Sequence, residues 1–163
     1  MPEQVVEQLI ARGWHISFAE SCTGGLAAAS LVSVPDASKV LDVSFVTYAN
    51  EAKIEYLDVD ADTIAQHGVV SEQVAYQMAA GVAKRAHSEV GVGITGIAGP
   101  TGDTPDKPIG MVCFGFYING KTFTSTQYFG NIGRNEVRLA STNYVYAQLQ
   151  CLLNIQTPLH SVS

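Results

Sequence analysis

The spacing of apolar residues predicts several amphipathic helices along the chain. Residues 3–12 carry an apolar face that ends at Gly13, and glycine commonly closes a helix. Ser71 is a preferred N-cap residue that precedes the longest apolar stripe, so we expect a long helix after it. A final helix is predicted over residues 134–153, with five side chains facing inward: Val137, Ala140, Tyr144, Ala147 and Cys151.

Runs of β-branched, aromatic and glycine residues predict the strands between these helices. Asn119-Gly120 is a strong hairpin signal, so the last two strands should pair antiparallel. An alanine-rich helix is expected over 26–31, and another over 51–57 with Asn50 as its cap. We therefore expect one α/β domain over residues 1–163, with its core at about 3–155, in which helices cover a mixed, partly antiparallel sheet. The expected strands are 15–19, 43–48, 90–95, 110–118 and 122–129.

The charge of the chain narrows the class of its partners. Only 15% of the 163 residues are charged, and nine Lys and Arg against 15 Asp and Glu leave a net charge of -6. The scattered basic residues do not form the cluster that nucleic-acid binding requires. The sequence contains neither a membrane-length apolar run nor a secretion signal, which predicts a cytoplasmic protein without a membrane partner. Three widely spaced cysteines indicate reduced thiols.

Two short motifs resemble ligand-binding loops, but their surroundings do not fit. Residues 91–96 match the GxGxxG pattern, yet they lie within an expected strand and Pro100 follows instead of a helix. Close backbone packing accounts better for these glycines. Residues 58–62 imitate a calcium loop, but Thr63 and Val69 replace its glycine and its bidentate acid, which favours a solvated turn with helix caps. The histidines have no paired spacing, so we predict neither a metal nor a cofactor.

Ser21 lies between an expected strand and an expected helix, in a loop with unusual properties. Thr23, Gly24 and Gly25 form the helix start, where free N–H groups bind an anion and glycines let a ligand approach the backbone. The alternative is that Ser21 or Thr23 merely caps the helix. A second glycine-rich loop, 95–100, also follows a strand. The two loops should converge at one end of the sheet, which is where α/β folds bind ligands.

Two cations are candidates to work with Ser21. If Ser21 is a nucleophile, Lys53 is a candidate base, but its pKa must fall from about 10.4 to about 7, a shift of ~4.6 kcal/mol that burial can supply. The alternative is a solvated lysine that pairs loosely with Glu51 or Glu55. Arg134 stands at a helix start, where the helix dipole disfavours a cation. Binding of a phosphate or carboxylate would explain this position, and a surface arginine is the alternative.

Taken together, these segments resemble one known family. Their order and sequence are similar to the CinA C-terminal domain family over about residues 3–155. The resemblance implies a three-layer α/β domain, assembled as a homo-oligomer and working without a metal. It also implies hydrolysis of nicotinamide mononucleotide to nicotinate mononucleotide and ammonia, because characterised members are nicotinamide-nucleotide amidohydrolases. The segments that carry the resemblance are 20–25, 48–53, 67–72, 95–100 and 107–110.

The resemblance also implies a role for each matching residue. Ser21 would attack the carboxamide carbon, Lys53 would take its proton, and Tyr48 would donate or relay a proton. In a variant of this mechanism, Ser21 only positions a water molecule. The N–H groups of Thr23, Gly24 and Gly25 would stabilise the oxyanion. The residues expected to bind the nucleotide are Asn50, Thr95, Gly96, Gly99 and Arg134, together with the three helix-start residues.

One departure from the family pattern leaves other functions open. Thr101-Gly102-Asp103 stands where family members commonly have consecutive glycines. An extra acid beside a phosphate pocket would repel the ligand. Two alternatives to hydrolysis of the mononucleotide follow: amide hydrolysis on another carboxamide, or a non-catalytic protein that binds a nucleotide or regulates another process.

Overall fold

A five-stranded mixed sheet lies between two helical layers and forms the centre of the protein. The computed structural model describes residues 2–155; residue 1 and residues 156–163 of the expected domain lie outside the described residues. The strand order is β2-β1-β3-β4-β5. β2, β1 and β3 run parallel, whereas β4 and β5 are antiparallel to their neighbours, so the expected mixed α/β sheet is confirmed. The strands are β1 (Ile16–Glu20), β2 (Phe45–Val46), β3 (Val90–Gly96), β4 (Met111–Ile118) and β5 (Lys121–Tyr128).

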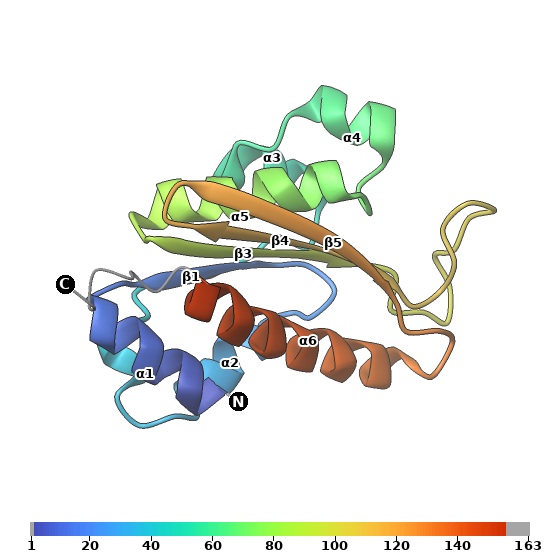
Figure 1. The fold of residues 1–163 in the computed structure, drawn as a ribbon. Coiled ribbons are helices and arrows are strands. Elements are labelled where there is room, and N and C mark those ends of the chain that lie inside the picture. The colour runs from blue at the N-terminus through green and yellow to red at the C-terminus, as the bar shows by residue number, and fades with distance from the viewer. Residues whose placement is uncertain (1, 156–163) are drawn as a thin grey trace.

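Helices cover both faces of this sheet, which makes a three-layer domain (Figure 1). On one face, α6 packs with α1 and α2, and the core between this layer and the sheet includes Leu9, Phe18, Phe114 and Tyr146. On the other face, α5 crosses β1, β3, β4 and β5, with α3 and α4 packed outside it. The helices are α1 (Pro2–Arg12), α2 (Leu26–Val32), α3 (Asn50–Leu57), α4 (Ala61–His67), α5 (Glu72–Ala86) and α6 (Arg134–Ile155), and a 3₁₀ turn η1 spans Ala37–Lys39.

Local signals account for several elements of this arrangement. The Ser71 hydroxyl accepts a hydrogen bond from the Val74 N–H and caps α5, as the sequence predicts. The β4–β5 hairpin turns at Asn119-Gly120, where both residues have positive φ. The interpretation of the strand glycines is also confirmed, because a Cβ at Gly93 would lie 2.6 Å from the Ala75 carbonyl oxygen. The absent side chain lets α5 approach β3 closely.

Three expectations about local structure are wrong, and one more is confirmed. The strand expected over 43–48 is only two residues long, because this segment lies at the sheet edge. Asn50 is the first residue of α3 and its side chain caps nothing. The interpretation of residues 58–62 as a turn with helix caps is confirmed, because Asp60 accepts from the Asp62 N–H and caps a helix, α4, that was not expected. In α6, Cys151 is exposed; the buried side follows a spacing of four residues, through Val137, Ser141, Val145 and Leu149.

Candidate active site

The two glycine-rich loops meet at the carboxyl end of the parallel strands. β1 leads into the Ser21 loop and β3 leads into the loop over 97–110, which projects from this end of the sheet (Figure 1). Between them lies a cavity of about 260 Å³. Eight of the residues expected in the site line it: Ser21, Tyr48, Asn50, Lys53, Thr95, Gly96, Gly99 and Arg134. The other lining residues are Cys22, Val69, Val70, Ile97, Ala98, Thr101 and Gly102.

Ser21 is fixed at the point where β1 ends. Its N–H donates to the Ile94 carbonyl oxygen of β3 at 3.1 Å, which extends the parallel pairing by one residue. The side chain is 9% exposed, and its Oγ accepts a hydrogen bond of 3.1 Å from Lys53 Nζ. The serine hydroxyl and the lysine amine therefore lie at hydrogen-bonding distance in the lining of the cavity.

Lys53 is a buried lysine rather than a solvated one. It is 1% exposed, and its Nζ also donates to the carbonyl oxygens of Thr47 and Tyr48, at 2.6 and 3.3 Å. Removal from water disfavours the ammonium form and lowers the pKa of Lys53 to about 8, although the nearby Cys22 thiol acts in the opposite direction. Much of the pKa decrease that a base at neutral pH requires is present.

Arg134 connects the two sides of the cavity. Its Nη1 donates to the Gly99 carbonyl oxygen at 2.7 Å, and its Nη2 donates to the Tyr48 hydroxyl at 2.9 Å. Tyr48 lines the cavity although it is 63% exposed, and this contact anchors its hydroxyl. The position of Arg134 at the start of α6, unfavourable for the helix dipole, is explained by these two contacts.

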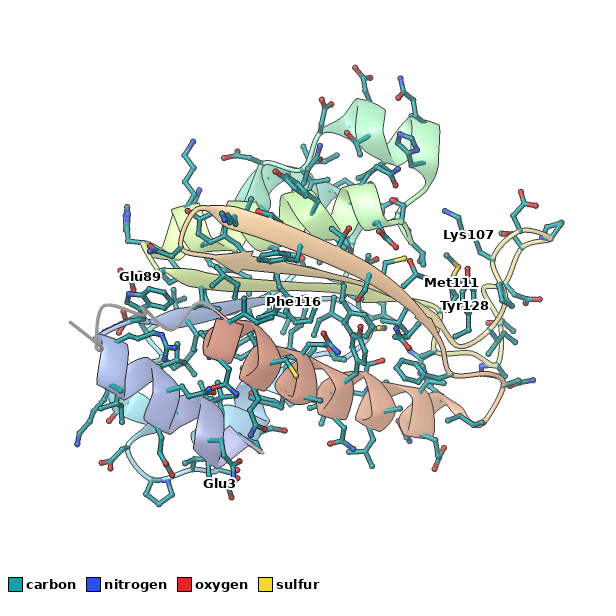
Figure 2. All side chains as sticks on the ribbon, viewed as in Figure 1. Glu3, Glu89, Lys107, Met111, Phe116 and Tyr128 are labelled. Carbon is teal, nitrogen blue, oxygen red and sulfur yellow. The ribbon has the colours of Figure 1, made fainter. Side chains whose placement is uncertain are left out.

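Two side chains hold the apolar wall made by Val69 and Val70. The buried Thr95 hydroxyl donates to the Val69 carbonyl oxygen at 2.9 Å. Lys107 Nζ donates to the carbonyl oxygens of Val70, at 2.6 Å, and His67. Figure 2 shows Lys107 at the end of the sheet opposite Glu89. Thr95 thus acts on the wall rather than offering its hydroxyl proton to a ligand.

The helix start formed by Thr23, Gly24 and Gly25 differs from the expectation. None of the three lines the cavity. The Gly24 N–H donates to the Ser21 carbonyl oxygen at 3.0 Å, and the Gly25 N–H donates to Glu20 Oε1 at 3.0 Å. The expectation that these two N–H groups are free for an anion is therefore wrong. The protein's own carboxylate occupies the start of α2.

Two charged residues beside the Ser21 loop have contacts that the sequence reasoning missed. Glu20 is fully buried and accepts from the N–H groups of Gly25, Ala27 and Ala28. Arg138 donates from Nε to the Cys22 carbonyl oxygen at 2.9 Å and from Nη2 to that of Thr23 at 3.1 Å. The only signal for Arg138 is its place one turn after Arg134 on the same helix.

This arrangement suits nucleophilic or general-base chemistry on a small polar molecule. A hydroxyl and an amine of lowered pKa adjoin in a concave site with an arginine at its rim. Within residues 2–155, no group of three or more His, Cys, Asp and Glu side chains could hold a metal ion. In the same residues, no helix is both long and apolar enough to cross a membrane.

Comparisons with known proteins agree with the fold and the motifs. The family model of the CinA C-terminal domain matches residues 1–153. A CinA-like protein from Kosmotoga olearia is 48% identical over 85% of this chain and 33% of its own length. Other curated relatives give similar values, so the chain spans about a third of the length of the curated relatives it matches.

Solved structures match over nearly their whole length. A CinA superfamily protein from Klebsiella pneumoniae superposes with a TM-score of 0.90 at 35% identity, covering 94% of this chain and 95% of that chain. A competence/damage inducible protein from Agrobacterium tumefaciens superposes with a TM-score of 0.85 at 38% identity, covering 96% of both chains. With its fold, its motif order and its family match in agreement, the chain belongs to the CinA C-terminal domain family.

Proposed function

We propose that this protein is an amidohydrolase that converts nicotinamide mononucleotide to nicotinate mononucleotide and ammonia. One observation carries the proposal: the Nζ of a lysine that is 1% exposed lies 3.1 Å from the Ser21 hydroxyl in the cavity. A serine is a weak nucleophile until an adjacent base accepts its proton. The resemblance to nicotinamide-nucleotide amidohydrolases supplies the substrate, because Ser21, Lys53, Tyr48 and Arg134 occupy the matching motif positions.

In the proposed reaction, neutral Lys53 removes the hydroxyl proton while Ser21 Oγ bonds to the carboxamide carbon. The carbonyl π electrons move onto oxygen, giving a tetrahedral intermediate. When this intermediate collapses, the C–N bond breaks, and the Lys53 ammonium returns its proton to the nitrogen that leaves as ammonia. Water then hydrolyses the acyl ester on Ser21, with Lys53 again accepting and returning the proton. In the variant mechanism, Ser21 positions this water for direct attack and no ester forms.

The structure favours a different donor for the oxyanion from those expected. Cys22 follows the nucleophile and lines the cavity, and within the described part of the chain its N–H donates to no other residue. We assign the oxyanion to this N–H, because the Gly24 and Gly25 N–H groups already have acceptors and Thr23 does not line the cavity. The residue after a nucleophile commonly serves this purpose in serine hydrolases.

The nucleotide portion of the substrate would lie toward the loop after β3. Arg134 is the cation at this rim, and two of its five N–H donors are used by Gly99 and Tyr48. The others can meet a phosphate oxygen. Asn50 and Gly96 line the same cavity, whereas Asp103 is exposed and does not line it. The acid that departs from the family pattern is therefore compatible with a phosphorylated substrate.

Ammonia release tests this proposal directly. The purified protein should release ammonia and nicotinate mononucleotide from the mononucleotide, and Ser21→Ala should abolish both. A panel containing free nicotinamide, the riboside and other carboxamides would identify a different amide substrate. Calorimetric binding of the mononucleotide without ammonia release would refute hydrolysis and support the non-catalytic class. Mass spectrometry of a quenched single turnover would detect the Ser21 ester. If no ester is detected while the protein releases ammonia at its full rate, the variant mechanism, in which Ser21 positions a water molecule, is favoured.

We further propose that this enzyme works as a homo-oligomer in the cytoplasm. Its segment over 43–56, at the β2 edge of the sheet, exposes five large apolar side chains, which a second copy would cover. These side chains are Val43, Val46, Tyr48, Ile54 and Tyr56. The three free cysteines suit a reducing compartment. Sedimentation velocity should give more than one chain per particle, and Val46→Asp should shift the distribution toward the monomer; a monomeric wild type would refute the assembly.

A further inference from the structure

Glu20 is a buried carboxylate placed immediately before the proposed nucleophile. It is fully buried at the end of β1, and a charged group in such a place requires strong partners. Those partners are backbone groups: Oε1 accepts from the Gly25 and Ala27 N–H groups, each at 3.0 Å, and Oε2 accepts from the Ala28 N–H at 2.9 Å. Among residues 2–155, no lysine or arginine forms an ion pair with it.

These contacts close the loop that carries Ser21. Residue 20 is bonded to residues 25, 27 and 28, so the loop begins and ends on the same carboxylate. The loop contains Gly24 and Gly25 at φ of 57° and 105°, a backbone region that glycine enters and leaves at little steric expense. Without a fixed closing contact, two adjacent glycines would let the serine hydroxyl move. The carboxylate supplies that contact.

The same residue also fixes the position of the base. The Glu20 carbonyl oxygen accepts from the Thr47 N–H at 2.9 Å, and the Thr47 carbonyl oxygen accepts from Lys53 Nζ at 2.6 Å. The backbone of Glu20 therefore fixes the segment at Thr47 that holds Lys53, while its side chain fixes the loop that carries Ser21. The two reacting side chains come from segments 32 residues apart, and both are bonded through Glu20.

We propose that Glu20 is a positioning residue for the Ser21–Lys53 pair, and that its carboxylate holds the helix start so that Ser21 Oγ stays within hydrogen-bonding distance of Lys53 Nζ. This inference rests on the proposed function for its kinetic test, but not for its geometric test. It also assigns the start of α2 to an internal anion. The substrate's phosphate must then bind elsewhere, which agrees with the rim at Arg134.

The test uses Glu20→Gln, which keeps the shape of the side chain but places an NH₂ group where one oxygen accepted. An amide nitrogen cannot accept from a backbone N–H, so at least one closing bond is lost. We expect kcat to fall about tenfold to a hundredfold with KM nearly unchanged, because small misplacements of reacting groups act mainly on the chemical step. A crystal structure of the variant should show Ser21 Oγ beyond hydrogen-bonding distance of Lys53 Nζ.

Tyr146→Phe is the matched control. It removes the hydrogen bond from the Tyr146 hydroxyl to the Ala27 carbonyl oxygen beside Glu20, but it leaves the Glu20 carboxylate and its three N–H donors in place. Its kcat should stay within about twofold of wild type even where its Tm falls. If Glu20→Gln does not fold, Glu20→Asp, which is one methylene shorter, replaces it in both measurements.

The outcomes separate the two proposals. A wild type that releases no ammonia refutes the proposed function, and the Ser21–Lys53 distance in the variant crystal still decides the role of Glu20. A variant that keeps this hydrogen bond overturns the positioning role. The positioning role is also overturned if Tyr146→Phe and Glu20→Gln lose the same amount of Tm and the same amount of kcat, because the loss of kcat would then follow from lower stability alone.

Discussion

The lowered pKa of Lys53 predicts how the activity depends on pH. Lys53 can accept the Ser21 proton only when it is neutral, and burial places its pKa at about 8. The neutral fraction is then about one tenth at pH 7 and about nine tenths at pH 9. We therefore expect kcat/KM for nicotinamide mononucleotide to rise about tenfold between these pH values and to level off above them. Initial rates of ammonia release over this range measure the profile.

Two variants identify the group that titrates. Cys22 also lines the cavity, but burial raises the pKa of its thiol to about 11, so it stays protonated across the rise. Cys22→Ala should therefore keep the ascending limb at the same pH. Lys53→Met should remove the limb and lower kcat by about a hundredfold or more, since it deletes the base. A flat wild-type profile from pH 7 to 9, or a limb that disappears in Cys22→Ala, would refute Lys53 as the base.

Three further predictions concern the residues around this pair. Between pH 8 and 10.5 the unfolded chain keeps the Lys53 proton that the folded chain has lost. The free energy of unfolding of wild type, measured in denaturant titrations relative to Lys53→Met, should therefore rise by about 3 kcal/mol over this pH range. If it does not rise, the pKa of Lys53 is not lowered by burial. Arg138→Met should lower kcat about tenfold, because it frees the carbonyl oxygens of the two residues after Ser21. Arg138→Lys should recover little of this kcat, because lysine lacks the planar guanidinium; full recovery would show that only the charge of Arg138 matters. Arg134→Met should raise KM for the mononucleotide about tenfold, and an equal effect on free nicotinamide would argue against a phosphate contact.

Elements of the fold that depend on local chemistry could be predicted from the sequence. The Ser71 cap and the Asn119-Gly120 turn each have a local cause that holds in any tertiary context, and the strand glycines indicate close packing without naming the element that packs there. The burial of a residue, by contrast, depends on its tertiary context. Cys151 fits an apolar stripe in the sequence, but the turn of α6 relative to the sheet places it in solvent. The strand expected over 43–48 has suitable residues, yet only one neighbour to pair with.

The candidate site was predictable in composition but not in geometry. Two loops that follow parallel strands must meet at one sheet edge, so the convergence of Ser21 and Gly99 follows from topology. Burial of Lys53 does not follow, because α3 has a weakly apolar composition and the lysine is enclosed by elements remote in sequence. The contact between Arg134 and Tyr48 joins residues 86 apart, which no local pattern indicates.

The start of α2 explains why a correct local rule led to a wrong assignment. Unpaired N–H groups and the helix dipole at a helix start favour a negative charge, and the Gly24-Gly25 sequence leaves room for one. That rule does not distinguish a substrate's anion from a carboxylate of the protein. Glu20 precedes Ser21 in the same motif, at the end of β1. Its carboxylate accepts from the N–H groups at the start of α2 and so occupies the place that a ligand's anion would take. A ligand could displace it only by leaving a fully buried carboxylate without partners, so anionic substrates are directed to the opposite rim, at Arg134.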